Sequence, residues 1–103
     1  MKKRKNTDQP ASAFEWDEEK RQKNIEKHGI DFSTAVLAFS DKKSFEYRSP
    51  IGEPEQRCVL IGEVEGRVIA VVYTIRHGVI RLISARRARR SEYERWARNE
   101  SLD

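Results

Sequence analysis

The sequence has few of the residues that form disulfides and metal centres. It contains one cysteine, Cys58, and two histidines, His28 and His77, which are far apart in its 103 residues. A single thiol excludes an internal disulfide and fits a reducing compartment, and a dedicated metal site needs more ligands than these. We therefore expect neither a metal ion nor another cofactor.

Long apolar runs and known cofactor-binding loops are also lacking. No run of about 18 apolar residues is present, and the basic start of the chain is not followed by the apolar core of a signal peptide. The sequence contains no glycine-rich phosphate loop and no HExxH segment. These absences predict a cytoplasmic protein that does not contact a membrane.

The sequence is rich in charge, and its positive charge is concentrated in two segments. Charged residues make up 37% of the chain, as do hydrophobic ones, and the formal net charge is +4. Residues 76–98 contain eight arginines against two glutamates. Because guanidinium groups bind phosphates through paired hydrogen bonds, this segment indicates a polyanionic or acidic partner. Residues 1–13 are polar and basic, which predicts a disordered tail.

Local patterns predict one α+β domain over residues 14–103. Asp17 and Gly29 are the expected N-cap and C-terminal glycine of a first helix, and Asp31 or Ser33 begins a second, short helix. Strands are expected at 44–49, 56–64, 67–76 and 79–86, and a C-terminal helix after Ala88. The first helix has few apolar residues, so we expect Phe14, Trp16 and Ile25 to anchor it.

Two-residue turns at Glu65–Gly66 and His77–Gly78 predict the pairing of the three long strands. Counting back from them places Arg57, Thr74 and Arg81 in one row across the sheet, and Val72 opposite Ile83. The same count places Arg86 on the other face, with Tyr73. Two arginines in one row need an acid or a bound anion nearby. They either pair with helix carboxylates or form a seat for phosphate.

A polar face of the first helix and a run of arginines are the other candidate sites. Lys20, Asn24, Lys27 and His28 lie about one turn apart, so they share a basic surface with one imidazole. Such a face is either solvated or lines a nucleic-acid cleft. The segment SARRARR, residues 84–90, brings Arg86, Arg87 and Arg89 to the end of a strand, where they can approach a nucleic-acid backbone.

Three blocks of the sequence resemble the BrnT toxin family of bacterial type II toxin–antitoxin systems. They are FEWDEEKRQKNIEKHGIDF, QRCVLIGEVEGRVIAVVYT and IRLISARRARRSEYER, and the motifs WDxxKxxxNxxKHG and ISAR are specific in combination. The resemblance implies a RelE-like fold with two N-terminal helices, a twisted antiparallel sheet of about four strands and a C-terminal helix. It also implies a ribonuclease that inhibits translation. A ribbon-helix-helix antitoxin, BrnA, would neutralise it and give the complex operator DNA binding.

Cleavage of RNA without a metal needs a base, an acid and cations that stabilise the charged transition state. We expect a catalytic set of His28, Lys20, Arg57 and Arg81, with Tyr73 as a reserve acid. The expected RNA-binding residues are Lys27, Arg86, Arg87 and Arg89. The alternative is a binding module without catalysis, in which the same basic surface holds nucleic acid or an acidic protein.

Overall fold

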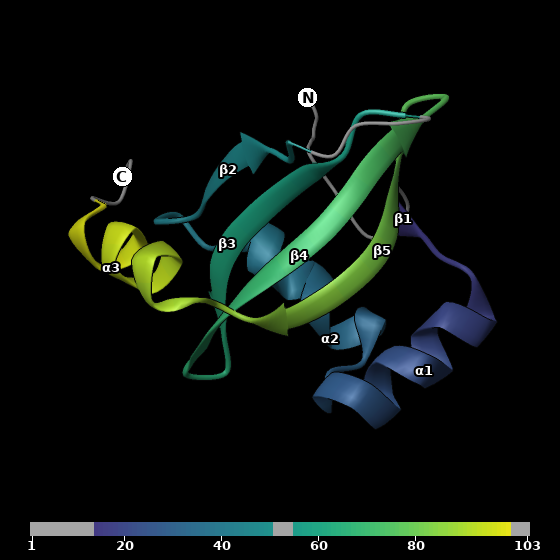
Figure 1. Cartoon of the computed structure of the whole chain (residues 1–103), viewed down its shortest axis with the longest axis horizontal. Coiled ribbons are helices and arrows are strands. Elements are labelled where there is room, and N and C mark those ends of the chain that lie inside the picture. The colour runs from purple at the N-terminus through teal and green to yellow at the C-terminus, as the bar shows by residue number, and fades with distance from the viewer. Residues whose placement is uncertain (1–13, 51–54, 100–103) are drawn as a thin grey trace, which may run out of the picture.

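The computed structural model describes residues 14–50 and 55–99, and a five-stranded sheet lies at its centre (Figure 1). The spatial order of the strands is β1-β5-β4-β3-β2. Their bounds are β1 (Phe14–Glu15), β2 (Phe45–Arg48), β3 (Cys58–Val64), β4 (Arg67–Arg76) and β5 (Val79–Arg87). Strands β2 to β5 pair antiparallel as expected, but β1 pairs parallel with β5. The sheet is therefore mixed and has five strands, whereas an antiparallel sheet of about four was expected. Strand β1 was not predicted because two residues leave no alternating pattern in the sequence.

Both predicted hairpin turns are present. Glu65–Gly66 and His77–Gly78 have positive φ at both residues, which is the backbone of a tight type I′ turn. Val64 pairs with Arg67 across the first turn, as predicted. The turns thus set the register of the strands on each side of them.

A β-bulge in β5 changes the register farther from the turn. Val72 pairs with Ser84, so Ile83 is an extra residue without a partner in β4. The expected pairing of Val72 with Ile83 is therefore wrong. The same shift corrects the expected position of Arg86, which lies on the same face of the sheet as Arg81. A bulge depends on packing in three dimensions, and counting from a turn cannot reveal it.

Helix α1 begins and ends where the capping signals indicated, and α2 begins at one of the two predicted caps. Their bounds are α1 (Glu18–His28), α2 (Phe32–Ala35), the 3-10 helix η2 (Val36–Ser40) and α3 (Arg90–Arg98). The Asp17 carboxylate accepts hydrogen bonds from the first turn of α1, and Gly29 ends this helix at φ 72°. Asp31 caps α2, which settles the choice between Asp31 and Ser33.

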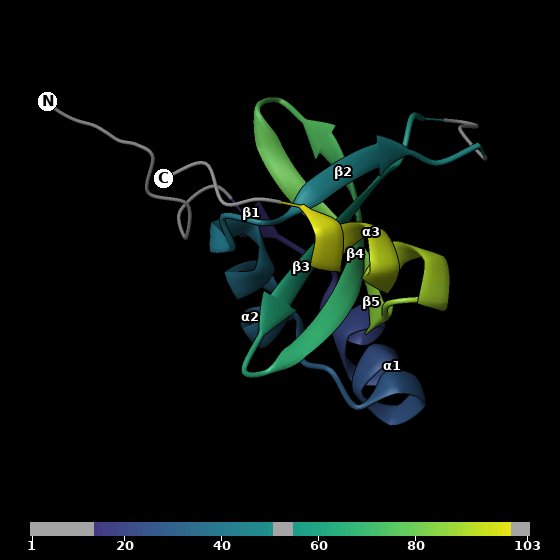
Figure 2. The same cartoon turned by 90° about the vertical axis from the view of Figure 1, so that its left-hand side faces the viewer.

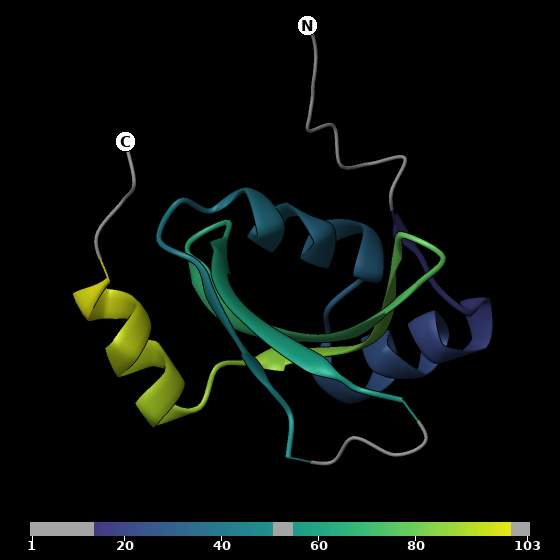
Figure 3. The ribbon, with the colours of Figure 1, turned by 90° about the horizontal axis from the view of Figure 1, so that it is seen from above.

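The three helices take different positions around the sheet. Helix α2 and η2 cover one face, whereas α3 lies on the other side (Figures 2 and 3). Helix α1 contacts β5 at the side of the sheet (Figure 1). On the α3 side, Trp96 packs against a small cluster that contains the buried Val59. The larger core cluster lies under α2 and η2 and includes Phe32 and Leu82.

Helix α1 is anchored differently from our expectation. Ile25 is 37% exposed, so its proposed role as an anchor is wrong. Phe14 and Trp16 do pack against the core, with ring centroids 5.0 Å from Phe39 and 6.0 Å from Phe32. The buried residue of α1 itself is the polar Asn24. The helix is therefore held by the segment before it and by hydrogen bonds.

Candidate functional site

A pocket of about 250 Å³ lies between α1 and the middle of β5. Its lining residues, which we call the α1–β5 groove, are Lys20, Lys23, Asn24, Lys27, His28, Ile83 and Ser84. Three of the predicted site residues, Lys20, Lys27 and His28, thus lie in one groove. All three are exposed, and none forms an ion pair within the described part of the chain. The groove can therefore receive an anion.

Asn24 fixes the position of this groove. Its amide nitrogen donates to the carbonyl oxygens of Ile30 and Ala85, each at 2.9 Å, and its amide oxygen accepts from Ala85 N–H at 3.1 Å. Asn24 thus satisfies both backbone groups of a β5 residue and joins α1 to the strand. The asparagine of the WDxxKxxxNxxKHG motif was the sequence signal, but the bond to Ala85 spans 61 residues and needed the structure.

Replacing Asn24 with alanine is expected to lower the free energy of unfolding by about 2 kcal/mol, because buried backbone groups of Ile30 and Ala85 would lose their partners. Urea unfolding followed by circular dichroism measures this change. Gln22→Ala on the exposed side of α1 is the matched control and should change stability by less than about 0.5 kcal/mol. Equal losses for the two variants would contradict this role of Asn24.

The predicted row of Arg57, Thr74 and Arg81 lies across one end of the sheet. Thr74 pairs with Arg81, and its hydroxyl donates to the Gln56 carbonyl oxygen at 2.9 Å. Arg81 forms an ion pair with Glu15 at 3.1 Å. In contrast, the buried Nε of Arg57 has no hydrogen-bond partner within residues 14–50 and 55–99. Of the two alternatives for the row, Arg81 follows the first, since it pairs with a carboxylate. Arg57 forms no ion pair with a residue in the described ranges, which leaves the phosphate seat open for it.

Glu55 adds a carboxylate beside this row. It accepts from Arg76 through two hydrogen bonds, 2.8 Å from Nη2 and 3.2 Å from Nε. The bonds from Arg76, followed by the nearby charges of Arg57 and Arg81, lower the pKa of Glu55 against the opposing effect of burial. Glu55 is therefore bound by Arg76, and the charges of Arg57 and Arg81 also favour its ionised form.

Arg86 is held in an ion pair under α3. Its guanidinium donates twice to Glu92, at 2.9 and 3.0 Å, and Glu92 also accepts from the Tyr47 hydroxyl at 2.5 Å and from Arg89 N–H at 2.7 Å. Burial raises the pKa of Glu92, but these donors outweigh it and lower that pKa to about 2. Neither Glu92 nor Tyr47 was predicted as a site residue. Glu92 is the N3 residue of a capping box at the start of α3, which was the available signal, but its contact with Tyr47 spans 45 residues. This cluster fixes α3 to the sheet.

Tyr73 is poorly placed to donate a proton. Its side chain is 4% exposed, and its hydroxyl donates to Glu46. Burial, followed by the hydrogen bond and charge of Glu46, raises the pKa of Tyr73. A phenol with a raised pKa is a weaker acid, so this geometry disfavours a role as the reserve acid.

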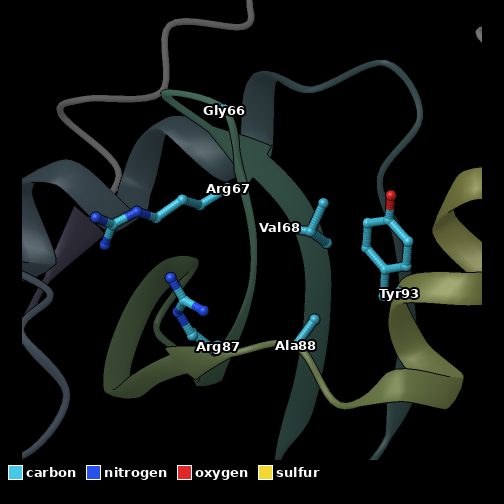
Figure 4. Close-up of a pocket in the computed structure, with 6 residues that line it drawn as sticks. All are labelled: Gly66, Arg67, Val68, Arg87, Ala88 and Tyr93. Carbon is cyan, nitrogen blue, oxygen red and sulfur yellow. The ribbon is translucent and has the colours of Figure 1, made fainter.

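The two remaining predicted residues lie near the start of α3. Arg87 lines a pocket of about 260 Å³ where β4 begins and β5 ends, together with Arg67 and Tyr93 (Figure 4). Arg89 precedes α3 and lines a different pocket, beside Phe45 and Tyr47. The candidate residues therefore form separate groups along α1, across the Arg57 row and around α3, and they do not surround a single phosphate.

In residues 14–50 and 55–99, no group of three or more His, Cys, Asp or Glu side chains has an arrangement that could hold a metal ion. None of the helices in these ranges is both long and apolar enough to cross a bilayer.

Comparison with known proteins adds one clear relationship. Residues 16–92 match the model of a family described as the ribonuclease toxin BrnT of type II toxin–antitoxin systems. A search of curated proteins gives no significant match. The family match covers α1, α2, η2, strands β2 to β5 and the start of α3, which includes the α1–β5 groove. This chain belongs to the BrnT family of ribonuclease toxins from type II toxin–antitoxin systems.

Proposed function

We propose that this toxin cleaves RNA without a metal ion, with the RNA strand lying in the α1–β5 groove. The observation that carries the proposal is the grouping of His28, Lys20 and Lys27 along one open surface beside Ser84. Imidazole and ammonium groups supply the proton transfer and positive charge that phosphodiester cleavage requires. Family membership supplies the reaction class, and the groove supplies the residue types.

The proposed reaction uses the 2′-hydroxyl of the RNA as its nucleophile. His28 accepts the hydroxyl proton, the 2′-oxygen attacks the adjacent phosphorus, and the bond from phosphorus to the 5′-oxygen breaks. The leaving 5′-oxygen takes a proton from a groove ammonium group, for which Lys27 and Lys20 are the candidates. The products are a 2′,3′-cyclic phosphate and a 5′-hydroxyl end.

The arginine row contributes to binding at a distance from His28. Helix α1 has 11 residues, so it is about 16 Å long at 1.5 Å per residue. Arg81 lies near the start of α1, where its charge lowers the pKa of Asp17 after the larger effect of two backbone N–H groups. His28 lies at the other end of the helix. We therefore assign Arg57 to a neighbouring phosphate of the strand, rather than to the phosphate that is cleaved, and Arg81 to its ion pair with Glu15.

The partner in the proposed function is a ribbon-helix-helix antitoxin of the BrnA type. The family places the toxin in a type II system, in which a protein antitoxin neutralises it. We propose that the antitoxin blocks the RNA surface in the cytoplasm and that the complex binds operator DNA. Co-expression with the neighbouring reading frame, followed by purification of a complex that no longer cleaves RNA, tests this part.

Incubation of the purified full chain with RNA in EDTA tests metal-independent cleavage. The expected result is RNA fragments that end in a 2′,3′-cyclic phosphate, at the same rate with and without added Mg²⁺. Cleavage that stops in EDTA and returns with Mg²⁺ would contradict the proposal. Intact RNA together with a strong shift in gel mobility would instead support the binding module without catalysis.

A further inference from the structure

We propose that the pocket where β4 begins and β5 ends binds one nucleotide of single-stranded RNA, with the base on Tyr93 and the flanking phosphates on Arg67 and Arg87. We call this site the Tyr93 pocket, and its lining residues are Gly66, Arg67, Val68, Arg87, Ala88 and Tyr93 (Figure 4). The inference rests on the proposed function, because it extends the path of the same RNA strand beyond the α1–β5 groove.

The two arginines of the Tyr93 pocket are free to bind an anion. Both are exposed, and neither has an ion pair or a side-chain hydrogen bond with the residues that the structure describes. Arg87 pairs with Ile69, two residues after Arg67, so both side chains share one face of the sheet. Figure 4 shows their guanidinium groups on the same side of the strands. Two like charges on neighbouring strands repel each other unless an anion lies between them.

Tyr93 supplies an aromatic surface in the same pocket, across the strands from the two arginines. Its side chain is 49% exposed, and its ring is tilted by 36° against Trp96 at a centroid distance of 5.8 Å. Val68 and Ala88 lie between this ring and the arginines (Figure 4). A half-exposed ring beside apolar side chains is a suitable platform for a nucleobase. The pocket volume of about 260 Å³ is below the usual range for drug-sized ligands, which suits a single base.

The Tyr93 pocket shares Arg67 with a second pocket at the end of α1. Arg67 also lines a second pocket with Gly29 and Ile30, the two residues that follow His28. Arg87 lies two residues after Ala85, which Asn24 binds. The two arginines therefore lie between the His28 end of the groove and Tyr93. An RNA strand that leaves the groove at His28 would meet the arginines first and then place a base on the Tyr93 ring.

Binding of a short fluorescein-labelled oligoadenylate with methylated 2′-hydroxyls, measured by fluorescence anisotropy, tests the pocket. Arg67→Ala and Arg87→Ala are each expected to weaken binding about tenfold and to reduce the salt slope by about one. Tyr93→Ala is expected to weaken binding about tenfold through lost stacking, with an unchanged salt slope. Tyr93→Phe keeps the ring and should bind like the wild type.

Arg98→Ala is the matched control for charge. Arg98 is exposed at the end of α3, outside the pocket, and forms no ion pair with a described residue. It should weaken binding clearly less than Arg67→Ala. An oligonucleotide without bases should bind Tyr93→Ala and the wild type equally. Thermal unfolding by circular dichroism confirms that each variant is folded.

The proposal is overturned if Arg67→Ala and Arg87→Ala match Arg98→Ala, or if folded Tyr93→Ala binds oligoadenylate as tightly as the wild type. The probe has no free 2′-hydroxyl, so it cannot be cleaved by the proposed reaction. A negative binding result for the Tyr93 pocket therefore does not change the expected result of the cleavage assay. If the protein does not cleave RNA, the binding assay can still be interpreted.

Discussion

Replacing His28 with asparagine is expected to reduce RNA cleavage by about 10²- to 10⁴-fold, the usual contribution of a general acid or base. His28 is the one imidazole that lines the α1–β5 groove, and it is exposed to a bound strand. Asparagine retains a polar side chain before Gly29 but cannot accept the hydroxyl proton. Cleavage of labelled RNA in EDTA under single-turnover conditions measures the loss.

His77→Asn is the matched control, because it makes the same chemical change at the other histidine. His77 lies in the turn between β4 and β5 with φ at 51°, a conformation that asparagine tolerates. This variant should cleave RNA at the wild-type rate. Both variants should bind a methylated oligonucleotide as the wild type does, since His28 is proposed to act in proton transfer. Wild-type cleavage by His28→Asn would remove His28 from the mechanism.

The largest expected effect on stability comes from Glu92. We expect Glu92→Ala to lower the free energy of unfolding by about 3 kcal/mol or more, the range for breaking one side of a buried ion pair. The Glu92 side chain is 7% exposed and that of Arg86 is 19% exposed, so the unpaired guanidinium would be poorly solvated. The Tyr47 hydroxyl and Arg89 N–H would lose their acceptor as well. Urea unfolding followed by circular dichroism measures the change.

Glu94→Ala is the control on the same helix. Glu94 pairs with Arg90, but these side chains are 51% and 91% exposed, so the pair lies at the surface. Its loss should cost less than about 1 kcal/mol. The double variant Arg86→Leu/Glu92→Leu should be more stable than Glu92→Ala, because it leaves no buried charge without a partner. Equal destabilisation by Glu92→Ala and Glu94→Ala would refute the buried pair as the anchor of α3.

The Glu92 cluster also predicts how stability depends on pH. The pKa of Glu92 is lowered from 4.5 to about 2, so folding favours its ionised form. Its stabilising contribution is therefore complete above about pH 4.5 and is lost as the pH falls towards 2. Acid unfolding of Glu92→Gln should depend less on pH over this interval. Asp31, with its pKa near 2 beside Arg21, retains part of the dependence in both proteins.

Tertiary packing decided features that no local pattern contains. The bulge at Ile83 moved Arg86 to the face of Arg81, and Glu92 then paired with it from α3. The Asn24 bonds to Ala85 and the approach of Arg67 to the end of α1 likewise join residues far apart in the chain. These contacts divided the predicted arginines into paired and free groups, which the sequence had left open.

The sequence by itself determined the elements whose causes are local. Asp17 and Gly29 set the ends of α1 through capping and backbone conformation, and the two hairpin turns set the register beside them. The motif around His28 also indicated the family correctly. Only the folded chain decided which cations face a groove and which are neutralised, because ion pairing and burial depend on distances between segments that the order of residues does not specify.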